Sequence, residues 1–416
     1  MYTELNPGLT QTQVSLKEET HRFAAEVLRP ASIELDKLAD PEDVIKEGST
    51  FWSVFRKYFE LERHLAGMPE ELGGTTMDPL ERQIVGEEMG WGSADLAIGL
   101  GVVSSPFSMA VVASQLFGDR RLVDELVVPY TKDRDAKYIG CWAITEPQHG
   151  ADTTVAALPG YTDNPAVSLE TRARRDGDDW IISGAKSAWV SNGTIATHGM
   201  VHFAVDRAKG PASTAIAIIP LNLPGVSKGK PLNKLGQRAL NQGEVFFDDV
   251  RIPDYYVVVK PELYPLVEDM ILSVANGGMS ATFTGLAQAA FEEAMTYCKQ
   301  RVQGGKPLCE HQLVQRKLFD MFIKVESSRA FSRALLTYNG QAAIPLSRFA
   351  VAGKIYATQT AFEVASDAVQ LFGGYGLSKE FLVEKLFRDA RASMIEDGAN
   401  DVLALTASRQ LIDTHL

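Results

Sequence analysis

Two neighbouring acids near the C-terminus are placed where they could do chemistry. The stretch RDARASMIEDGAND, which ends at Asp401, sets Glu396 and Asp397 side by side directly before Gly398. Adjacent carboxylates before a glycine are typical of a solvated turn, but one of them can also be a general base directed into a pocket. The pair alone favours the turn, so the rest of the chain must decide between the two interpretations.

Two stretches near the middle of the chain contain residue types that suit a flat ligand. In ITEPQHGAD, which begins at Ile144, the Thr, Gly and Ala residues leave backbone N–H groups open to a planar or anionic group. GAKSAWVSNG places Trp189 and Ser191 two residues apart, and therefore on one side of a strand. An indole beside a hydroxyl suits a planar heterocycle, while an ordinary loop and a core tryptophan are the alternative interpretation.

Two further stretches lie in the C-terminal third. RVQGGKPLCEHQ begins at Arg301, which could bind a phosphate bidentately but could also be a solvated arginine at a helix end. A Gly-Gly-Lys-Pro turn follows, and the helix pattern resumes at His311 and Gln312. QLFGGYG, which begins at Gln370, ends a helix; a C-cap explains Gly373 but not the amide and the other glycines.

The elements that must position these stretches form three zones. From residue 11 to about 135 the apolar spacing is helical, and Pro30 is expected to end the first helix, VSLKEETHRFAAEVLRP. From about 138 to 255, short β-rich runs such as VSLETRAR and GEVFFDDVRIP alternate with turns, which predicts an antiparallel barrel or sandwich. After Pro261 the pattern returns to long helices. No GxGxxG opens a helix, so a Rossmann unit is not predicted.

The predicted fold class is therefore α+β and mostly helical. We expect an N-terminal helical bundle over residues 1–137, an antiparallel β-barrel domain over 138–257, and a C-terminal four-helix bundle over 258–416.

Bulk composition narrows the class of protein. The chain has 416 residues and a net charge of -12, so nucleic-acid binding is not expected. There is no uninterrupted apolar run of membrane-spanning length and no signal-peptide pattern at the N-terminus, so we expect no membrane span. Cys141, Cys298 and Cys309 are odd in number and widely spaced, which favours reduced thiols and a cytoplasmic location. No histidine or cysteine spacing predicts a metal site.

Taken in order, the motifs resemble those of the acyl-CoA dehydrogenase family. ITEPQHGAD is similar to its TEPxxGSD loop, GAKSAWVSNG to its GxKxWITN strand, and RVQGGKPLCEHQ to its RxxFGKPLxxxQ turn. QLFGGYGLSKEFLVEKLFRDAR is similar to its QxFGGxGxxxExxxExxxRDAR segment. The resemblance runs from about residue 10 to the C-terminus and agrees with the predicted order of domains.

The resemblance implies bound FAD and an acyl-CoA substrate. In the family, part of the FAD site belongs to a neighbouring subunit, and a homotetramer with an electron-transfer flavoprotein as electron acceptor is expected. The implied cofactor-binding residues are Trp142, Ile144, Thr145, Gly150, Ala151, Trp189, Ser191, Arg301, Gln303, His311, Gln312, Gln370, Gly373, Gly374, Ala399 and Asp401. The implied substrate-binding residues are Ala151, Asn276, Tyr375 and Gly398.

The opening acids also have a place in the family pattern RDARxxxIYEGT. The catalytic base is usually the Glu before Gly, and that position here is Asp397, while Glu396 stands where Tyr is usual. The resemblance therefore implies that Asp397 removes the α proton while the β hydrogen leaves as hydride to the flavin. An aspartate is one methylene shorter, roughly 1.5 Å of reach, and it must be buried to become an effective base.

Asp at this position is typical of a minority of the family, including dehydrogenases of alicyclic acyl-CoA thioesters. We therefore expect a cyclic or unsaturated acyl group. Other departures are Ala151 for Ser, Ala399 for Thr, Gly304 for Phe and Asn276 for Arg, and Ala275 leaves no second base.

Three alternatives remain open from the sequence. The first is an oxidase of the nitroalkane type, which would use the same Asp397 without CoA. The second is a dehydrogenase of straight or branched short-chain acyl-CoA. The third is a flavin-binding protein without chemistry, for which the missing Glu is the main support.

Overall fold

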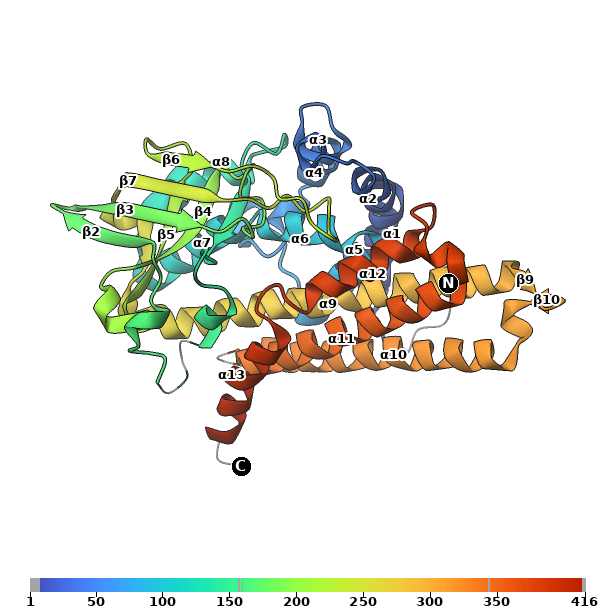
Figure 1. Cartoon of the computed structure of the whole chain (residues 1–416). Coiled ribbons are helices and arrows are strands. Elements are labelled where there is room, and N and C mark those ends of the chain that lie inside the picture. The colour runs from blue at the N-terminus through green and yellow to red at the C-terminus, as the bar shows by residue number, and fades with distance from the viewer. Residues whose placement is uncertain (1–7, 156–157, 159, 343–344, 414–416) are drawn as a thin grey trace.

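The computed structural model describes residues 8–155, 158, 160–342 and 345–413. The predicted order of a helical, a β and a second helical part is confirmed, and Figure 1 shows the β domain against one end of the long helices. The hairpin of β9 (Val302–Gln303) and β10 (Lys306–Pro307) lies at the opposite end of those helices.

The N-terminal part is helical, and local signals begin its helices. Thr10 and Gln13 form a capping box at the start of α1, and Asp78 and Glu81 form another at the start of α5. The elements of this part are α1 (Gln11–Phe23), η1 (Ala24–Leu28), α2 (Arg29–Asp36), α3 (Pro41–Ile45), α4 (Thr50–Glu60), η2 (Arg63–Leu65), η3 (Glu70–Leu72), α5 (Pro79–Gly92), α6 (Ala94–Val102), α7 (Ser105–Phe117), η4 (Val123–Val127) and α8 (Val128–Thr131).

The expectation that Pro30 ends the first helix is wrong. One turn of π-helix, Ala24–Leu28, joins α1 to α2, and Pro30 lies in the first turn of α2. The helix continues through this point, with the Arg29 N–H bonded to the Ala24 carbonyl oxygen in the wider π pattern. A π-helical turn of this kind accommodates a proline that an unbroken α-helix would not tolerate. Pro129 follows the π-helical turn Val123–Val127 in the same way.

One region of this part has a membrane-like composition. Residues 94–117 are long and apolar enough to cross a membrane, and 56% of their most apolar window is buried inside the protein. A core helix of a folded domain meets the same criterion.

The middle part is one sheet with the strand order β6-β7-β3-β2-β4-β5-β8, and β1 pairs with β4. The strands are β1 (Gly140–Ala143), β2 (Arg172–Asp176), β3 (Asp179–Lys186), β4 (His198–Ala204), β5 (Thr214–Pro220), β6 (Val226–Lys228), β7 (Val245–Pro253) and β8 (Val257–Val259). Short 3-10 turns lie at Ala151–Val155, Pro165–Val167, Arg207–Ser213 and Asp254–Tyr256.

This sheet differs in detail from the predicted antiparallel barrel. The pairs β1–β4 and β2–β4 are parallel, and β6 and β8 form the two ends of the order among the described residues. Only strands that follow each other through a short turn, such as β2–β3, are bound to be antiparallel. The strand predicted over VSLETRAR forms only from Arg172 onward.

The C-terminal part consists of α9 (Tyr264–Gln300), α10 (Gln312–Gln341), α11 (Ser347–Phe372), α12 (Leu382–Ser393) and α13 (Asn400–Asp413), with short 3-10 turns at Pro261–Leu263, Leu308–Glu310 and Gly373–Leu377. The first four run along one another, and α13 turns away from them (Figure 1). The 37 residues of α9 give it a length of about 55 Å. Its middle crosses α5 closely, because a Cβ added to Gly285 would lie 1.9 Å from the Glu87 carbonyl oxygen.

Candidate functional site

The two acids lie in the loop between α12 and α13. Asp397 has a φ of 51° and Gly398 a φ of 97°, so the chain passes through the left-handed region at both residues. Such a conformation at a residue other than glycine is strained and persists only where its surroundings hold it. Lys354 of α11 provides part of that support: its buried ammonium donates to the Gly398 carbonyl oxygen at 2.8 Å and to Asn400 Oδ1 at 2.7 Å.

The two carboxyl groups differ in their partners. Glu396 Oε1 accepts a hydrogen bond from Gln237 Nε2 of the β domain. The Asp397 carboxyl group makes no hydrogen bond and no ion pair with any described residue, although the Lys354 ammonium is close enough to act on it. Gln237 therefore holds one oxygen of Glu396, whereas both oxygens of Asp397 are free to meet a ligand.

Burial makes both acids weaker than usual. It raises the pKa of Asp397, and the Lys354 ammonium partly opposes the shift. Burial raises the pKa of Glu396 to about 7; Gln237 opposes this shift and the neighbouring Asp397 adds to it. Burial also lowers the pKa of Lys354 to about 8. A weaker conjugate acid is a stronger base, which is the requirement that the sequence set for Asp397.

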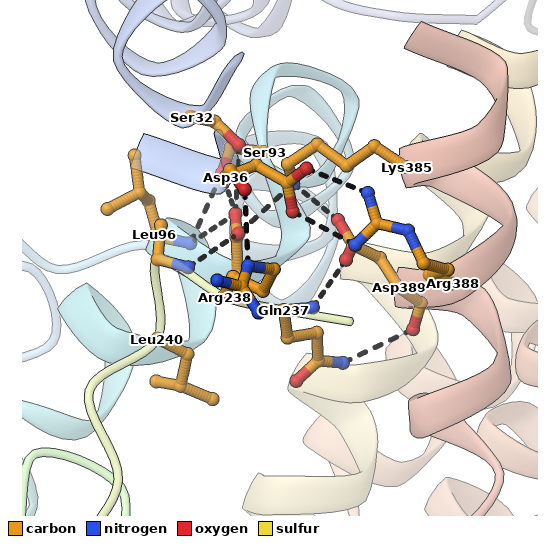
Figure 2. A network of polar contacts seen from close by, with 12 residues as sticks. Ser32, Asp36, Ser93, Leu96, Gln237, Arg238, Leu240, Lys385, Arg388 and Asp389 are labelled. Carbon is orange, nitrogen blue, oxygen red and sulfur yellow. Dashed lines mark hydrogen bonds and ion pairs between the residues drawn. The ribbon is translucent and has the colours of Figure 1, made fainter. Parts of the chain in front are cut away.

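Gln237 belongs to a polar junction where all three parts of the chain meet (Figure 2). Its backbone N–H donates to Asp389 of α12, and Asp389 is bound by the Lys385 ammonium. The same ammonium binds Asp95 of the N-terminal part at 3.0 Å, and Asp95 accepts from the Ala239 N–H at 3.1 Å. Lys385, Asp389 and Asp95 are almost completely buried, so these charges compensate one another inside the protein.

Arg388 also belongs to this junction and connects α12 with α2 and with the β domain. It binds Asp36 of α2 at 2.7 Å and Glu384 of its own helix at 2.7 Å, and it donates to the Leu235 carbonyl oxygen at 2.9 Å. The RDAR segment thereby holds the loop that contains Gln237 (Figure 2).

The same β-domain loop leads to the predicted aromatic site. Lys234 donates to Gln242 Oε1 at 2.8 Å, and Gln242 Nε2 donates to the Trp189 carbonyl oxygen at 3.2 Å and to Ser191 Oγ at 3.4 Å. Lys234 is also close enough to Glu396 for the two charges to interact. Loop 234–242 therefore connects Trp189 and Ser191 with the two acids.

A cavity of about 350 Å³ lies beside Trp189. Thr145, Gly150 and Trp189 are among its lining residues, and Trp189 is 58% exposed. A buried ion pair beneath it joins Lys186 and Glu146 at 2.6 Å, and Lys186 also donates to the Ile144 carbonyl oxygen at 3.2 Å. An exposed indole face on a fixed loop fits a planar ring such as isoalloxazine.

The other cofactor-binding residues predicted in the β domain and at α13 do not line this cavity. Ala151 begins the turn Ala151–Val155, which α13 contacts through a 3.1 Å hydrogen bond from Thr406 to the Thr154 carbonyl oxygen. Ala399 and Asp401 lie at the start of α13. Trp142 Nε1 donates to His202 Nε2 at 2.9 Å, and His202 Nδ1 lies 3.1 Å from the Tyr264 hydroxyl at the start of α9.

The second predicted group lies elsewhere, at the hairpin end of the bundle. A cavity of about 880 Å³ there is lined by Arg301, Gln303, His311, Gln370, Gly373 and Gly374. Tyr375, which was expected at the substrate, lines this cavity instead, with the Arg301 guanidinium 5.7 Å from its ring centre. Tyr375 directly follows Gly374 in the turn Gly373–Leu377, so both residues lie at the same cavity. Gln312 begins α10 and does not line the cavity.

Gly304 is explained by the hairpin turn. Gly304 and Gly305 have φ values of 64° and 82°, the conformation of a two-residue type I′ turn, which strongly favours glycine. The Phe of the family pattern would be strained at this position.

Asn276, the other predicted substrate residue, is fully buried on α9. Its Nδ2 donates to the Leu272 carbonyl oxygen at 3.0 Å, and its Oδ1 has no partner. This side chain therefore bonds back to the preceding turn of its own helix and offers no cation where the family has Arg.

The sequence did not single out Gln237, Lys354, Lys234 or His202. Gln237, Lys354 and His202 bind residues more than 40 positions away, and Lys234 lies in a loop without a motif. No local pattern in the sequence could therefore identify these four residues. Among the described residues no group of three or more His, Cys, Asp or Glu side chains could hold a metal ion.

Comparison with protein families gives three matches along the chain. They are the acyl-CoA dehydrogenase N-terminal domain over residues 10–127, the middle domain over 141–250 and the C-terminal domain over 269–412.

Individual proteins agree with these matches. Short-chain specific acyl-CoA dehydrogenase from Bos taurus mitochondria is 30% identical over 98% of this chain and 92% of its own length. Cyclohexane-1-carbonyl-CoA dehydrogenase from Geobacter metallireducens is 29% identical over 71% of this chain and 73% of its own length. The structure of butyryl-CoA dehydrogenase from Megasphaera elsdenii superposes with a TM-score of 0.84 at 27% identity, covering 98% of this chain and 100% of the other.

Proposed function

This chain belongs to the acyl-CoA dehydrogenase family, and from that premise we propose that it oxidises a cyclic or unsaturated acyl-CoA with FAD as cofactor and Asp397 as base. As a member of the family it is an oxidoreductase acting on CH–CH bonds. The identity of the base and the nature of the acyl group are the new parts of the proposal.

The observation that supports Asp397 is the contrast between the two adjacent acids. Glu396 is bound by Gln237, whereas the Asp397 carboxyl group has no partner among the described residues. A base must be free to approach the carbon that it deprotonates. The left-handed conformation at residue 397 and the Lys354 contact with the Gly398 carbonyl oxygen fix the backbone from which the free carboxyl group extends.

The chain would contribute a proton transfer and a polarised carbonyl to the reaction. Bound FAD would supply the acceptor for the β hydride. Asp397 would take the α proton, and the electron pair of that C–H bond would form the new double bond. The backbone N–H at the base would donate to the thioester carbonyl oxygen, which makes the α proton more acidic. Trp189 and Thr145 would pack against the flavin ring.

The proposal of a cyclic or unsaturated substrate is supported by the aspartate at position 397 and by similarity to the Geobacter enzyme. A second candidate is a straight short-chain acyl-CoA, favoured by the bovine short-chain relative and by the butyryl-CoA dehydrogenase structure. Both candidates use the same base.

Replacement of the base tests the proposal. Asp397→Asn should bind FAD as the wild type does but reduce it at least about 100-fold more slowly with an acyl-CoA, the usual size of a lost general base. Stopped-flow absorbance of the flavin under anaerobic conditions measures the rate. Asp248→Asn, an exposed acid on β7, is the matched control. An Asp397→Asn enzyme that reduces its flavin at the wild-type rate would exclude Asp397 as the base.

A substrate panel separates the candidates. We expect faster bleaching of the flavin with cyclohexane- or cyclohexene-carboxyl-CoA than with butyryl-CoA. The reverse order would assign the short-chain function. Oxygen uptake with nitroethane would identify an oxidase, and no bleaching with any compound would favour a flavin-binding protein without chemistry.

We propose a homo-oligomer, expected to be a tetramer, because one chain holds the two halves of the predicted cofactor site far apart. Trp142 connects through His202 to Tyr264 at the start of α9, and Arg301 follows its end. The helix between them is about 55 Å long, more than one dinucleotide can span. The hairpin-end cavity would therefore serve the FAD of a neighbouring copy.

Two further expectations accompany this function. An electron-transfer flavoprotein would reoxidise the flavin, which steady-state turnover with that protein as the sole acceptor would test. The cytoplasmic location remains a proposal, supported by three unbonded cysteines, two of which are buried.

A further inference from the structure

Glu396 occupies the position at which the family has Tyr, and its side chain is bound within the protein. Its carboxyl group is bound by the Gln237 amide of the β domain, 159 positions earlier in the chain. It is the residue directly before Asp397, so any force on its side chain acts on the backbone of the proposed base.

Gln237 is a firm anchor for this contact. It is 2% exposed and has a φ of 50°, and its N–H is bound by the buried Asp389 carboxylate. The preceding Gly236 lies directly on α12: a Cβ there would be 2.4 Å from the Arg388 carbonyl oxygen. The amide of Gln237 is therefore fixed by backbone contact and by the three-part junction of Figure 2.

We propose that Glu396 is a positioning residue for Asp397, which it holds in place through Gln237 while its charge strengthens the base. The inference rests on the proposed function, because it assumes that Asp397 takes the proton. One contact thus links the junction of all three parts of the chain to the position of the reactive carboxylate.

The charged groups around Glu396 are compatible with a positioning effect and with an electrostatic effect on Asp397. Lys234 faces it from the β-domain loop, Lys354 faces it from α11, and Asp397 is its neighbour in the chain. An ionised Glu396 raises the free energy of a second negative charge on Asp397 and so increases the proton affinity of the base. The two acids titrate as a pair, so the pH profile of the reaction reports on both.

Three variants of the FAD-loaded enzyme separate position from charge. Glu396→Gln keeps an oxygen that accepts from Gln237 but removes the charge. Glu396→Leu removes both the accepting oxygen and the charge. Gln237→Leu removes the amide that holds Glu396 but keeps the charge of Glu396. The rate of flavin reduction by an acyl-CoA that the wild type oxidises is measured from pH 5 to 9, with bound FAD determined by absorbance.

We expect Glu396→Gln to keep the limiting rate within about 3-fold while the midpoint of its pH profile moves about one unit lower. Glu396→Leu and Gln237→Leu should each lose about 10- to 100-fold at every pH, the effect of a small displacement of reacting groups. Their double variant should lose no more than either single variant, because both break the same contact.

Other outcomes would overturn the inference. A wild-type rate and pH midpoint in Glu396→Leu would show that Glu396 does not position the base. Additive losses in the double variant would show that the two residues act separately. A loss in Glu396→Gln as large as in Glu396→Leu, with Asp397→Asn still active, would instead make Glu396 the base, and the proposed assignment of Asp397 would fail. If Glu396→Leu fails to bind FAD, the pH midpoint of Glu396→Gln still decides on the charge.

Discussion

The two ends of the helical bundle hold their parts of the proposed site by opposite means. At the end that carries Asp397, called the base end here, Gln237, Asp389, Asp95 and Lys354 are each at most 2% exposed. The first three have partners from another part of the chain, and Lys354 binds Gly398 within the C-terminal part. At the hairpin end, the cavity of about 880 Å³ is lined largely by exposed residues such as Arg301.

In our proposal, this difference follows from the different roles of the two ends. A proton transfer depends on sub-ångström placement, which needs rigid and mutually compensated contacts within one chain. A surface that receives the cofactor of another copy must remain open until the copies associate. The base end is therefore complete in a single chain, and the hairpin end is completed by a partner in our proposal.

The strongest test of this contrast replaces the buried acid at the junction. Asp95→Asn should lower the free energy of unfolding by about 3 to 5 kcal/mol, because it leaves the Lys385 ammonium short of a buried partner. Chemical denaturation measures the change. Asp119→Asn, which removes an exposed acid paired with Arg121, should cost less than about 1 kcal/mol.

The pH dependence of the free energy of unfolding is a second test of the contribution of Asp95. Lys385 and the hydrogen bonds of its neighbours lower the pKa of Asp95 to about 2 against burial, which opposes them. Because the pKa in the folded state lies below the ordinary aspartate value of 3.8, this contribution to stability is present above pH 4 and is lost as the pH falls toward 2. Equal acid sensitivity in wild type and Asp95→Asn would contradict the assignment.

Alanine substitutions at two glycines test how tightly each end of the bundle is packed. Gly236→Ala at the base end should destabilise the fold by about 1 to 3 kcal/mol, because the new methyl group collides with the backbone of α12. Gly304→Ala at the hairpin end meets only His311 Cε1 at 3.1 Å and adds strain at a positive φ, a cost of about 1 kcal/mol. Thermal unfolding of the two variants should show the larger loss for Gly236→Ala, and the opposite order would contradict the comparison.

The smallest expected effect on the fold comes from Arg301→Ala. Arg301 is exposed and makes no ion pair with a described residue, so the thermal stability of the apoprotein should change little. FAD affinity should fall about 10-fold if Arg301 binds a phosphate of the cofactor. Equilibrium dialysis with FAD and sedimentation velocity measure affinity and assembly. Unchanged FAD binding would remove the hairpin end from the cofactor site.

Local signals in the sequence determined much of the architecture. The capping boxes at Thr10 and Asp78 begin helices, and the Gly-Gly pair at 304 and 305 forms the expected tight turn. The order of helical, β and helical parts was also predicted. These features depend on residues within a few positions of one another, and so their physics is contained in short stretches. Pro30 does not end its helix, because the π-helical turn before it accommodates the proline.

The tertiary structure alone decided which acid is free. Glu396 and Asp397 are equivalent candidates in the sequence apart from the family pattern, and a partner 159 positions away distinguishes them. The same holds for Asp95 with Lys385, 290 positions apart, and for Asp36 with Arg388, 352 positions apart. Such pairs form only where packing brings distant segments together and removes water from around their charges. No local pattern of residues records that event.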